Sequence, residues 1–322
     1  METLHTIADA GNEVFLFVAI RRSTSVPVTA TAARATSPRS ANVSTERATE
    51  SDRALTGRWY VRAWAISCTR DGEGSGLMDV EVAPGIRRLS QGVVNFYLIE
   101  GGGRFTLVDA GTPRDWALLV PTLASLGRSL DDLEGVVLTH AHSDHTGFAE
   151  RARTDAGAAI WIHGADEAVA KGAAPPKNAA GFGRYLWRAE AYRTLISLSR
   201  RGGAKIVPIA QVSTFADGET IDVPGRPRAV HAPGHTAGSS AILLEDRRAA
   251  LTGDVVVMRN PLTGRTGPQI MPSGLNLDSD QALRSLDAVE RLPADLVLPG
   301  HGNPWTAGAA EAARAARAAG PS

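Results

Sequence analysis

Apolar residues fall into short runs that alternate with stretches of helical spacing over most of the chain. Residues 93–99 and 105–108 are rich in β-branched and aromatic side chains and are separated by a glycine turn, so they predict two neighbouring strands. Residues 116–126 carry apolar side chains at helical spacing and are followed by Gly127, which is typical of a helix C-terminus. Residues 136–139 form a short apolar run, which indicates a buried strand.

The same alternation continues to the end of the chain. Further strands are predicted at residues 159–162, 229–230, 241–244, 249–251 and 296–298. Further helices are predicted at residues 148–156, 185–199, 282–292 and 307–319. Two β-rich halves with helices between them predict an α/β fold in which two sheets pack face to face and helices lie outside.

The first 77 residues are a different kind of sequence. Residues 23–56 are dominated by Ser, Thr, Ala, Pro and Arg, and such a segment buries too little apolar surface to offset its ordering entropy. We expect residues 1–77 to be a disordered leader, either a genuine tail or an over-extended reading frame with Met78 as the natural start. A peptide from this segment in natively expressed protein would exclude the second explanation. The folded domain then covers residues 78–322, with a helical insertion near residues 173–201.

Composition excludes several kinds of partner. The chain has 34 basic and 34 acidic residues, and nucleic-acid binders usually carry a basic excess. The early apolar run at residues 14–20 is too short to span a bilayer, and arginines follow it rather than precede it. The single cysteine, Cys68, allows no intrachain disulfide and fits a reducing cytoplasm. We therefore expect a cytoplasmic protein with a small-molecule substrate, no nucleic acid and no membrane partner.

Three histidines and one aspartate occur within six residues, directly after the strand predicted at residues 136–139. They are His140, His142, Asp144 and His145. Such side chains are costly to bury without partners, whereas a metal ion takes imidazole nitrogens and carboxylate oxygens as ligands. In an extended loop His140 and His142 point the same way and can reach one metal ion. Asp144 and His145 can then turn towards a second ion.

Three further candidate ligands follow later strands. His235, Asp254 and His301 each lie after an apolar strand, and each is directly preceded by glycine, which lets the backbone turn sharply. Together with the loop they form an ordered series of seven candidates. His163 is interpreted as a structural or surface residue, and His231, four residues before His235, as a residue that supports the ligands or packs nearby rather than binding metal.

This ordered series resembles that of the metallo-β-lactamase superfamily, in which an HxHxDH loop is followed by His, Asp and His on later strand ends. The resemblance covers roughly residues 79–305. It implies an αββα sandwich of two mixed β-sheets with outer helices, and an active site along one edge of the two sheets. Asp109 matches the family's earlier acidic motif, which implies that it orients ligands rather than binding metal.

The resemblance also implies how the seven candidates divide between two metal ions. One ion would be bound by His140, His142 and His235, and the other by Asp144, His145 and His301, with Asp254 bridging both. Zinc is the expected metal, and iron or manganese stay open because these ligand types suit them as well.

A metal-dependent hydrolase follows from this ligand set. Two metal ions lower the pKa of a bridging water from about 15.7 towards 7, so that a hydroxide serves as the nucleophile. Asp144 and Asp254 are the expected catalytic carboxylates, with Asp144 as a candidate proton shuttle. True β-lactamases generally lack the bridging carboxylate, so Asp254 argues against antibiotic hydrolysis. The expected reaction is cleavage of a small ester, thioester or lactone, similar to glyoxalase II-like and lactonase-like members.

The sequence also leaves two alternative functions open and predicts a substrate pocket. The protein would instead be a phosphodiesterase, or a persulfide dioxygenase-like oxidoreductase with a single iron, although the complete series favours two metals. The expected substrate pocket consists of aromatic residues in the insertion, which suit an apolar acyl chain or ring. They are Phe182, Tyr185, Trp187 and Tyr192. An equal case can be made that these residues are ordinary core contacts of the insertion.

Overall fold

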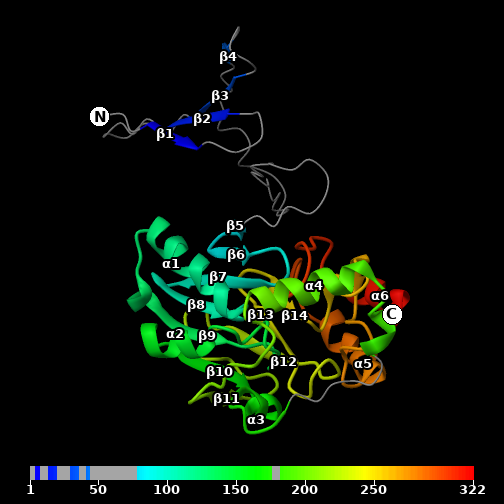
Figure 1. Ribbon diagram of the computed structural model, residues 1–322. Coiled ribbons are helices and arrows are strands. Elements are labelled where there is room, and N and C mark those ends of the chain that lie inside the picture. Colours follow the sequence, from blue (N-terminus) through cyan, green and yellow to red (C-terminus); the bar gives the residue numbers. More distant parts are fainter. Residues whose placement is uncertain (1–3, 8–13, 20–29, 36–40, 44–77, 176–181) are drawn as a thin grey trace. The chain divides into compact units, whose positions relative to one another are not determined.

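The computed structural model in Figure 1 describes residues 4–7, 14–19, 30–35, 41–43, 78–175 and 182–322. The chain divides into two units, residues 1–60 and 61–322. In the first unit, the described residues form an antiparallel sheet of β1 (Leu4–Ile7), β2 (Val14–Ala19), β3 (Ala30–Ala35) and β4 (Ala41–Val43). The remainder of residues 1–77 lies outside the described residues, so the expected disorder and the alternative start at Met78 stay predictions.

The second unit is built on two mixed sheets. The larger sheet has the order β11-β10-β9-β8-β7-β6-β5, and the smaller has the order β12-β13-β14-β17. The strands of the larger sheet are β5 (Met78–Ala83), β6 (Ile86–Ser90), β7 (Asn95–Gly101), β8 (Arg104–Val108), β9 (Leu133–Val137), β10 (Ala159–His163) and β11 (Ser213–Phe215). Those of the smaller sheet are β12 (Arg228–His231), β13 (Ser240–Leu244), β14 (Ala249–Gly253) and β17 (Leu296–Pro299). A separate ribbon pairs β15 (Val257–Arg259) with β16 (Thr266–Gln269).

Helices cover the outer faces of both sheets (Figure 1). The α-helices are α1 (Trp116–Ser125), α2 (Ala149–Ala156), α3 (Glu167–Ala170), α4 (Ala189–Arg200), α5 (Ser279–Glu290) and α6 (Ala309–Ala319). Residues of α1 and α2 share a core with the outer face of the larger sheet. Residues of α5 and α6 share a second core with the outer face of the smaller sheet.

The alternation of side chains along each strand explains why three apolar layers form. In β7, Phe96 and Leu98 contribute to the core under α1 and α2, whereas Tyr97 and Ile99 contribute to the core between the sheets. Successive strand residues point to opposite faces, and all four of these side chains are buried. A strand buried on both faces reads as a continuous apolar run, as β7 does. The predicted αββα sandwich is confirmed.

The hairpin of β5 and β6 was not among the predicted strands. Its sequence is broken by charged side chains, and the structure pairs them across the strands: Arg87 Nε lies 2.7 Å from Asp79 Oδ1. Charges at the edge of a sheet obscure the alternation that marks a strand, and they also protect that edge from pairing with other chains. In the insertion, α4 begins at Ala189 rather than at Tyr185, which lies in a 3-10 turn at Phe182–Tyr185.

Candidate metal centre

The seven candidate ligands come from loops that follow strands of both sheets. β9 leads into the loop that carries four of them, and His235 lies in the connection between β12 and β13. Asp254 directly follows β14, and His301 lies two residues after β17. β14 and β17 run parallel, with Gly253 opposite Pro299, so Asp254 and His301 leave the smaller sheet at the same edge.

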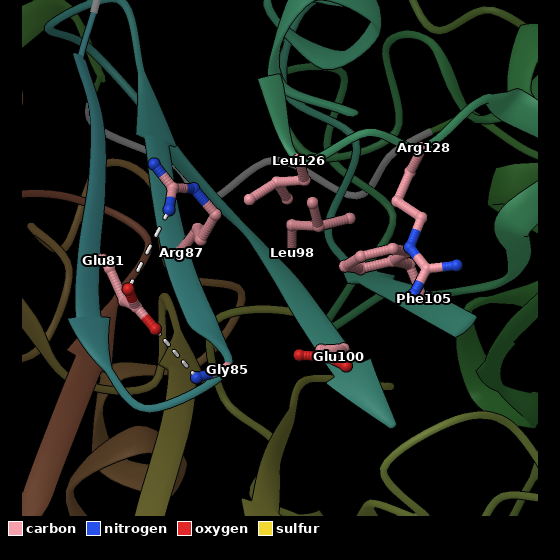
Figure 2. Close-up of a pocket in the computed structure, with 8 residues that line it drawn as sticks. All are labelled: Glu81, Gly85, Arg87, Leu98, Glu100, Phe105, Leu126 and Arg128. Carbon is pink, nitrogen blue, oxygen red and sulfur yellow. Dashed lines mark hydrogen bonds and ion pairs between the residues drawn. The ribbon is translucent and has the colours of Figure 1, made fainter. Parts of the chain in front are cut away.

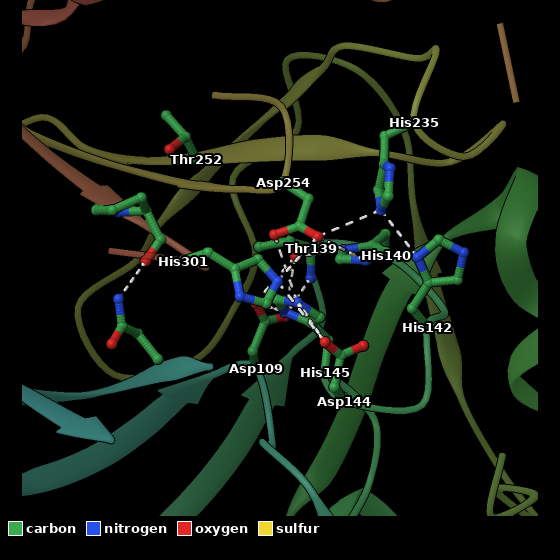
Figure 3. Close-up of polar contacts among 12 residues, drawn as sticks. Asp109, Thr139, His140, His142, Asp144, His145, His235, Thr252, Asp254 and His301 are labelled. Carbon is green, nitrogen blue, oxygen red and sulfur yellow. Dashed lines mark hydrogen bonds and ion pairs between the residues drawn. The ribbon is translucent and has the colours of Figure 1, made fainter. Parts of the chain in front are cut away.

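The structure brings all seven side chains together, as Figure 3 shows, and we call this set the metal centre. The atoms that can bind a metal lie within 4.8 Å of one another in each of three groups. The groups are His140, His142 and His235; Asp144, His145 and His301; and His140, His145 and Asp254. The first two coincide with the sets that the resemblance implies, and the third contains Asp254 with one member of each.

Asp254 lies between the first two groups. Its Oδ2 is 3.3 Å from Nε2 of His235 in the first group and 3.4 Å from Nε2 of His301 in the second. Its Oδ1 is 3.5 Å from Nε2 of His145. Oδ2 of this carboxylate therefore faces both groups, and Oδ1 faces the second.

Several inward-facing atoms lack a hydrogen-bond partner. Among the described residues, Nε2 of His140, His145 and His301 and Oδ1 of Asp254 are buried without one. Leaving a buried polar atom unsatisfied costs about 1–3 kcal/mol, so four in one place are costly unless a ligand binds them. A divalent cation satisfies such lone pairs together, and imidazole nitrogens with carboxylate oxygens are the donors that zinc takes. The residues of the metal centre therefore fit a metal ion.

The outer nitrogens of four imidazoles are each held by a hydrogen bond. The contacts are His140 Nδ1 to Thr139 Oγ1 at 3.0 Å, His145 Nδ1 to Asp109 Oδ2 at 2.8 Å, His235 Nδ1 to Asn276 Oδ1 at 3.3 Å and His301 Nδ1 to Val93 O at 2.7 Å. In each case Nδ1 donates, because the partner oxygen is an acceptor or already donates elsewhere, as Thr139 Oγ1 does to Asp109. Each Nε2 then faces inward and can bind a metal ion when it carries no proton. His142 instead directs Nδ1 inward, 2.8 Å from Nε2 of His235.

Asp109 makes the contacts expected of a residue that orients ligands. Its carboxylate accepts hydrogen bonds from the Thr139 backbone N–H at 2.8 Å and from the Thr139 hydroxyl, in addition to the one from His145. Asp109 has a φ of 64°, a left-handed conformation that is unfavourable for a residue other than glycine. The contacts of its carboxylate offset that cost. Its supporting role stays a prediction, for which these contacts give a physical basis.

The electrostatic surroundings of the two ligand groups differ. Burial lowers the pKa of His140 well below its ordinary value, and His145 and His235 lower it further. Burial also lowers the pKa of His142 to about 3, and His235 adds to the effect. Burial opposes protonation of His145 as well, but Asp254 and two other carboxylates outweigh it and raise its pKa to about 10. His140 and His142 are therefore neutral, the form that binds metal, whereas a metal ion at His145 must displace a proton.

Glycines that precede the ligands are required for two different reasons. Gly253 has a φ of 47°, and a Cβ there would lie 2.4 Å from Thr139 Oγ1. Gly300 has no such φ, yet a Cβ there would lie 2.4 Å from Asp254 Oδ1 and 2.7 Å from His145 Cε1. The sharp turn expected from sequence accounts for Gly253, but at Gly300 the requirement is for space.

The predicted substrate-pocket residues are dispersed. Tyr185 is buried with Ala191 and Leu262 in a small core of the insertion, and its hydroxyl contacts Ser273. Trp187 is 75% exposed and Tyr192 is 51% exposed. The side chain of Phe182 lies outside the described residues. For Tyr185 the structure therefore favours the core interpretation, and the pocket assignment of the other three stays a prediction.

A small cavity of about 170 Å³ lies away from the metal centre (Figure 2). Its lining includes Phe105 near the start of β8 and Glu100 near the end of β7. Asp109 follows the opposite end of β8, and none of the seven candidate ligands lines the cavity. It is therefore separate from the candidate active site.

Several residues that support the metal centre were missed from the sequence. Asn95, at the start of β7, donates from its side chain to the carbonyls of Pro299 and Gly302 on either side of His301. Tyr97 donates to the Pro299 carbonyl at 2.8 Å. A buried amide in an otherwise apolar strand was a signal that could have identified Asn95. Asn276 and Asp166 carry no comparable signal, because each lies in an ordinary polar turn.

Two stacked mixed sheets with His and Asp side chains gathered at their strand ends define a metal-dependent hydrolase of the αββα class. The model of the metallo-beta-lactamase superfamily matches residues 89–301, and the chain belongs to this superfamily.

Several known proteins are similar to this chain over most of the domain. The chain is 23% identical over 265 residues to the probable metallo-hydrolase YflN of Bacillus subtilis (strain 168), covering 75% of this chain and 90% of that protein. It is 27% identical over 213 residues to the atrochrysone carboxyl ACP thioesterase of Aspergillus fumigatus, covering 65% of this chain and 50% of that protein. A solved metallo-beta-lactamase family protein from Thermus thermophilus has a TM-score of 0.53 and 26% identity, covering 74% of this chain and 80% of that one.

Among the described residues, none of the helices has the length and apolar character needed to cross a membrane.

Proposed function

We propose that the protein is a dinuclear zinc hydrolase that cleaves a small ester, thioester or lactone. The observation that carries this proposal is the position of Asp254, whose oxygens lie 3.3–3.8 Å from imidazole nitrogens of both ligand groups. A carboxylate can share its two oxygens between two cations, and this position favours two ions over one.

The carboxylates of the metal centre have different roles in the proposed reaction. Two zinc ions would supply a water of lowered pKa and a Lewis acid for the carbonyl oxygen of the substrate. Asp254 holds the two halves of the site in register, because it contacts histidines of both groups. Asp144 has a side chain that is 16% exposed, more open than the 0–3% of the imidazoles and carboxylates beside it. With the metal ions bound, Asp144 would accept a proton from the attacking water and return it to the leaving group.

Thioesters gain support within this substrate class from the relative whose name describes an ACP thioesterase. The second part of the proposal is that the substrate is a small molecule and that the protein acts in the cytoplasm. The cytoplasmic location is supported by the single cysteine, Cys68, which allows no intrachain disulfide.

Metal analysis and a substrate screen test the proposal. The full-length protein should contain about two zinc ions per chain and hydrolyse a lactone, thioester or aryl ester in a panel that also contains phosphodiesters and β-lactams. Turnover should be lost in His140→Ala and kept in His163→Ala, which removes a histidine outside the metal centre. If the protein instead contains one iron per chain and consumes oxygen in the presence of a persulfide, the alternative of a persulfide dioxygenase-like oxidoreductase would be supported. Unchanged turnover in His140→Ala would overturn the proposal.

A further inference from the structure

Asp166 is a buried carboxylate close to the metal centre that belongs to none of its ligand groups. It lies at the end of a 3-10 turn (Gly164–Asp166) that directly follows β10, and it is 2% exposed. Its hydrogen bonds run to two loops that are distant in sequence. Because the Asp166 side chain is bonded to both loops, it fixes the distance between them.

One of the two loops carries His140 and His142. The backbone N–H of Ala141, the residue between these two ligands, donates to Asp166 Oδ2 at 3.0 Å. A bond at this position holds the backbone segment from which both imidazoles reach the first ligand group. Asp166 thus acts on both ligands of this loop through one peptide group.

The other loop carries His235. The hydroxyl of Thr236, the next residue, donates to Asp166 Oδ2 at 2.7 Å, and the backbone N–H of Gly238 donates to Oδ1 at 2.8 Å. A Cβ at Gly238 would lie 2.6 Å from the carboxylate carbon of Asp166, so the loop closes tightly around this side chain. Asp166 is therefore bonded next to every nitrogen ligand of the first group.

We propose that Asp166 is a positioning residue that sets the spacing of His140, His142 and His235 and so determines the affinity of the first ligand group for metal. This inference rests on the proposed metal function, and it assigns to Asp166 a selective effect on one of the two ions. The second group, Asp144, His145 and His301, is oriented by other contacts, from Asp109 and the Val93 carbonyl. Its affinity should change little when Asp166 is altered.

Asp166→Asn provides the main test because it preserves the shape of the side chain. An amide has a single acceptor oxygen, and its NH2 group must face either the Gly238 N–H or the Ala141 N–H, so at least one of these two backbone groups loses its acceptor. Titration of the metal-free protein with Zn²⁺ and with Co²⁺ should show one site weakened about 10- to 100-fold, with the other within about threefold of wild type. The cobalt absorption spectrum reports the geometry of the weakened site independently of activity.

Two pairs of variants separate positioning from general stability. Thr236→Val removes one donor to Asp166 and should weaken the same site less than Asp166→Asn does, whereas Thr236→Ser keeps the hydroxyl and should restore it. Asp115 is a matched buried carboxylate, 1% exposed, that accepts hydrogen bonds from the backbone and hydroxyl of Thr112 and lies 3.5 Å from the guanidinium of Arg201. Asp115→Asn should lower the unfolding temperature and leave both metal affinities in place.

The outcomes divide clearly. Equal weakening of both sites in Asp166→Asn, or a loss of stability with both affinities unchanged, would overturn the positioning role. A wild-type protein that binds two metal ions but hydrolyses none of the proposed substrates would overturn the proposed function alone, since the metal titration would still decide the role of Asp166. A wild-type protein that binds no divalent metal would overturn both.

Discussion

Two groups of histidines lie near strand ends of the sandwich, and they differ in what their ring nitrogens face. In the metal centre, imidazole nitrogens converge on one place, and three of them have no hydrogen-bond partner among the described residues. His163 and His231 instead stack face to face, with ring centroids 4.0 Å apart and an angle of 6° between the planes. His163 Nδ1 accepts from Ala165 N–H, and His231 Nε2 donates to the Ala237 carbonyl.

This difference indicates that a candidate metal site is recognised by the convergence of unpartnered nitrogens rather than by the proximity of rings. The stacked pair joins β10 of one sheet to β12 of the other, which is a structural task. The interpretation of His163 as a structural or surface residue is consistent with these contacts.

The largest expected effect comes from removing the carboxylate that faces both ligand groups. Asp254→Ala should lower turnover by more than about 100-fold, beyond the roughly 10- to 100-fold that loss of an outer partner costs. It should also reduce the zinc content, because the two groups then lose the carboxylate that lies between them, and Asp144 remains only beside His145 and His301. Asp246→Ala, which alters a carboxylate that is 68% exposed, is the matched control. Retention of full zinc content and turnover in Asp254→Ala would show that the convergence of these side chains does not identify the metal site.

A smaller effect is expected from the outer partner of His145. Asp109→Asn should reduce zinc affinity about 10- to 100-fold, because the amide replaces a charged acceptor for His145 Nδ1 and for Thr139. Competition with a chromophoric chelator measures the change. An affinity within twofold of wild type would contradict an orienting role for Asp109.

The stacked pair should respond through stability alone. His163→Ala removes one ring of the stack and should lower the free energy of unfolding by about 0.5–1.5 kcal/mol, the range for aromatic pairs. Zinc stoichiometry should equal that of wild type. Loss of a zinc ion in this variant would show that the stacked pair contributes to metal binding and would contradict its structural interpretation.

The smallest effect is a dependence on pH. Burial lowers the pKa of His163, His231 lowers it further, and Asp166 and Asp217 act in the opposite direction. Since the pKa in the folded state lies below the ordinary value of 6.5, the unfolded chain binds more protons below that pH, and the contribution of His163 to stability falls as the pH falls. His163→Phe keeps an aromatic ring and should lose less stability than wild type between pH 8 and pH 5.5 in urea unfolding. An identical pH dependence in both proteins would contradict this assignment.

The sequence predicted the parts of the molecule that depend on local pattern. Continuous apolar runs such as β7 and β14 are buried on both faces, so the two sheets were foreseeable. The HxHxDH loop and the later ligands could be predicted because burying His and Asp side chains costs free energy unless they share a binding partner. The tight contacts of Asp166 with Ala141 and Gly238 were not, because they join segments distant in sequence through an ordinary turn.

The insertion was predicted less well for a related reason. Aromatic residues in a helix are equally consistent with a pocket, a core or an exposed surface, and only tertiary packing decides between them. Tyr185 entered a core while Trp187 remained exposed, although they are two residues apart. The edge hairpin was missed because charge pairs such as Arg87 with Asp79 replace the apolar alternation.

The close packing at Gly300 limits how this enzyme can diversify. Any side chain at that position would enter the space occupied by Asp254 and His145, so we expect substitutions of Gly300 to disrupt the metal centre. We expect new substrate preferences to arise in segments that can vary without disturbing the ligands, and the exposed positions of α4 are one candidate. A directed-evolution library that leaves Gly253 and Gly300 fixed and randomises exposed positions of α4 should retain far more active members than one that samples both regions equally.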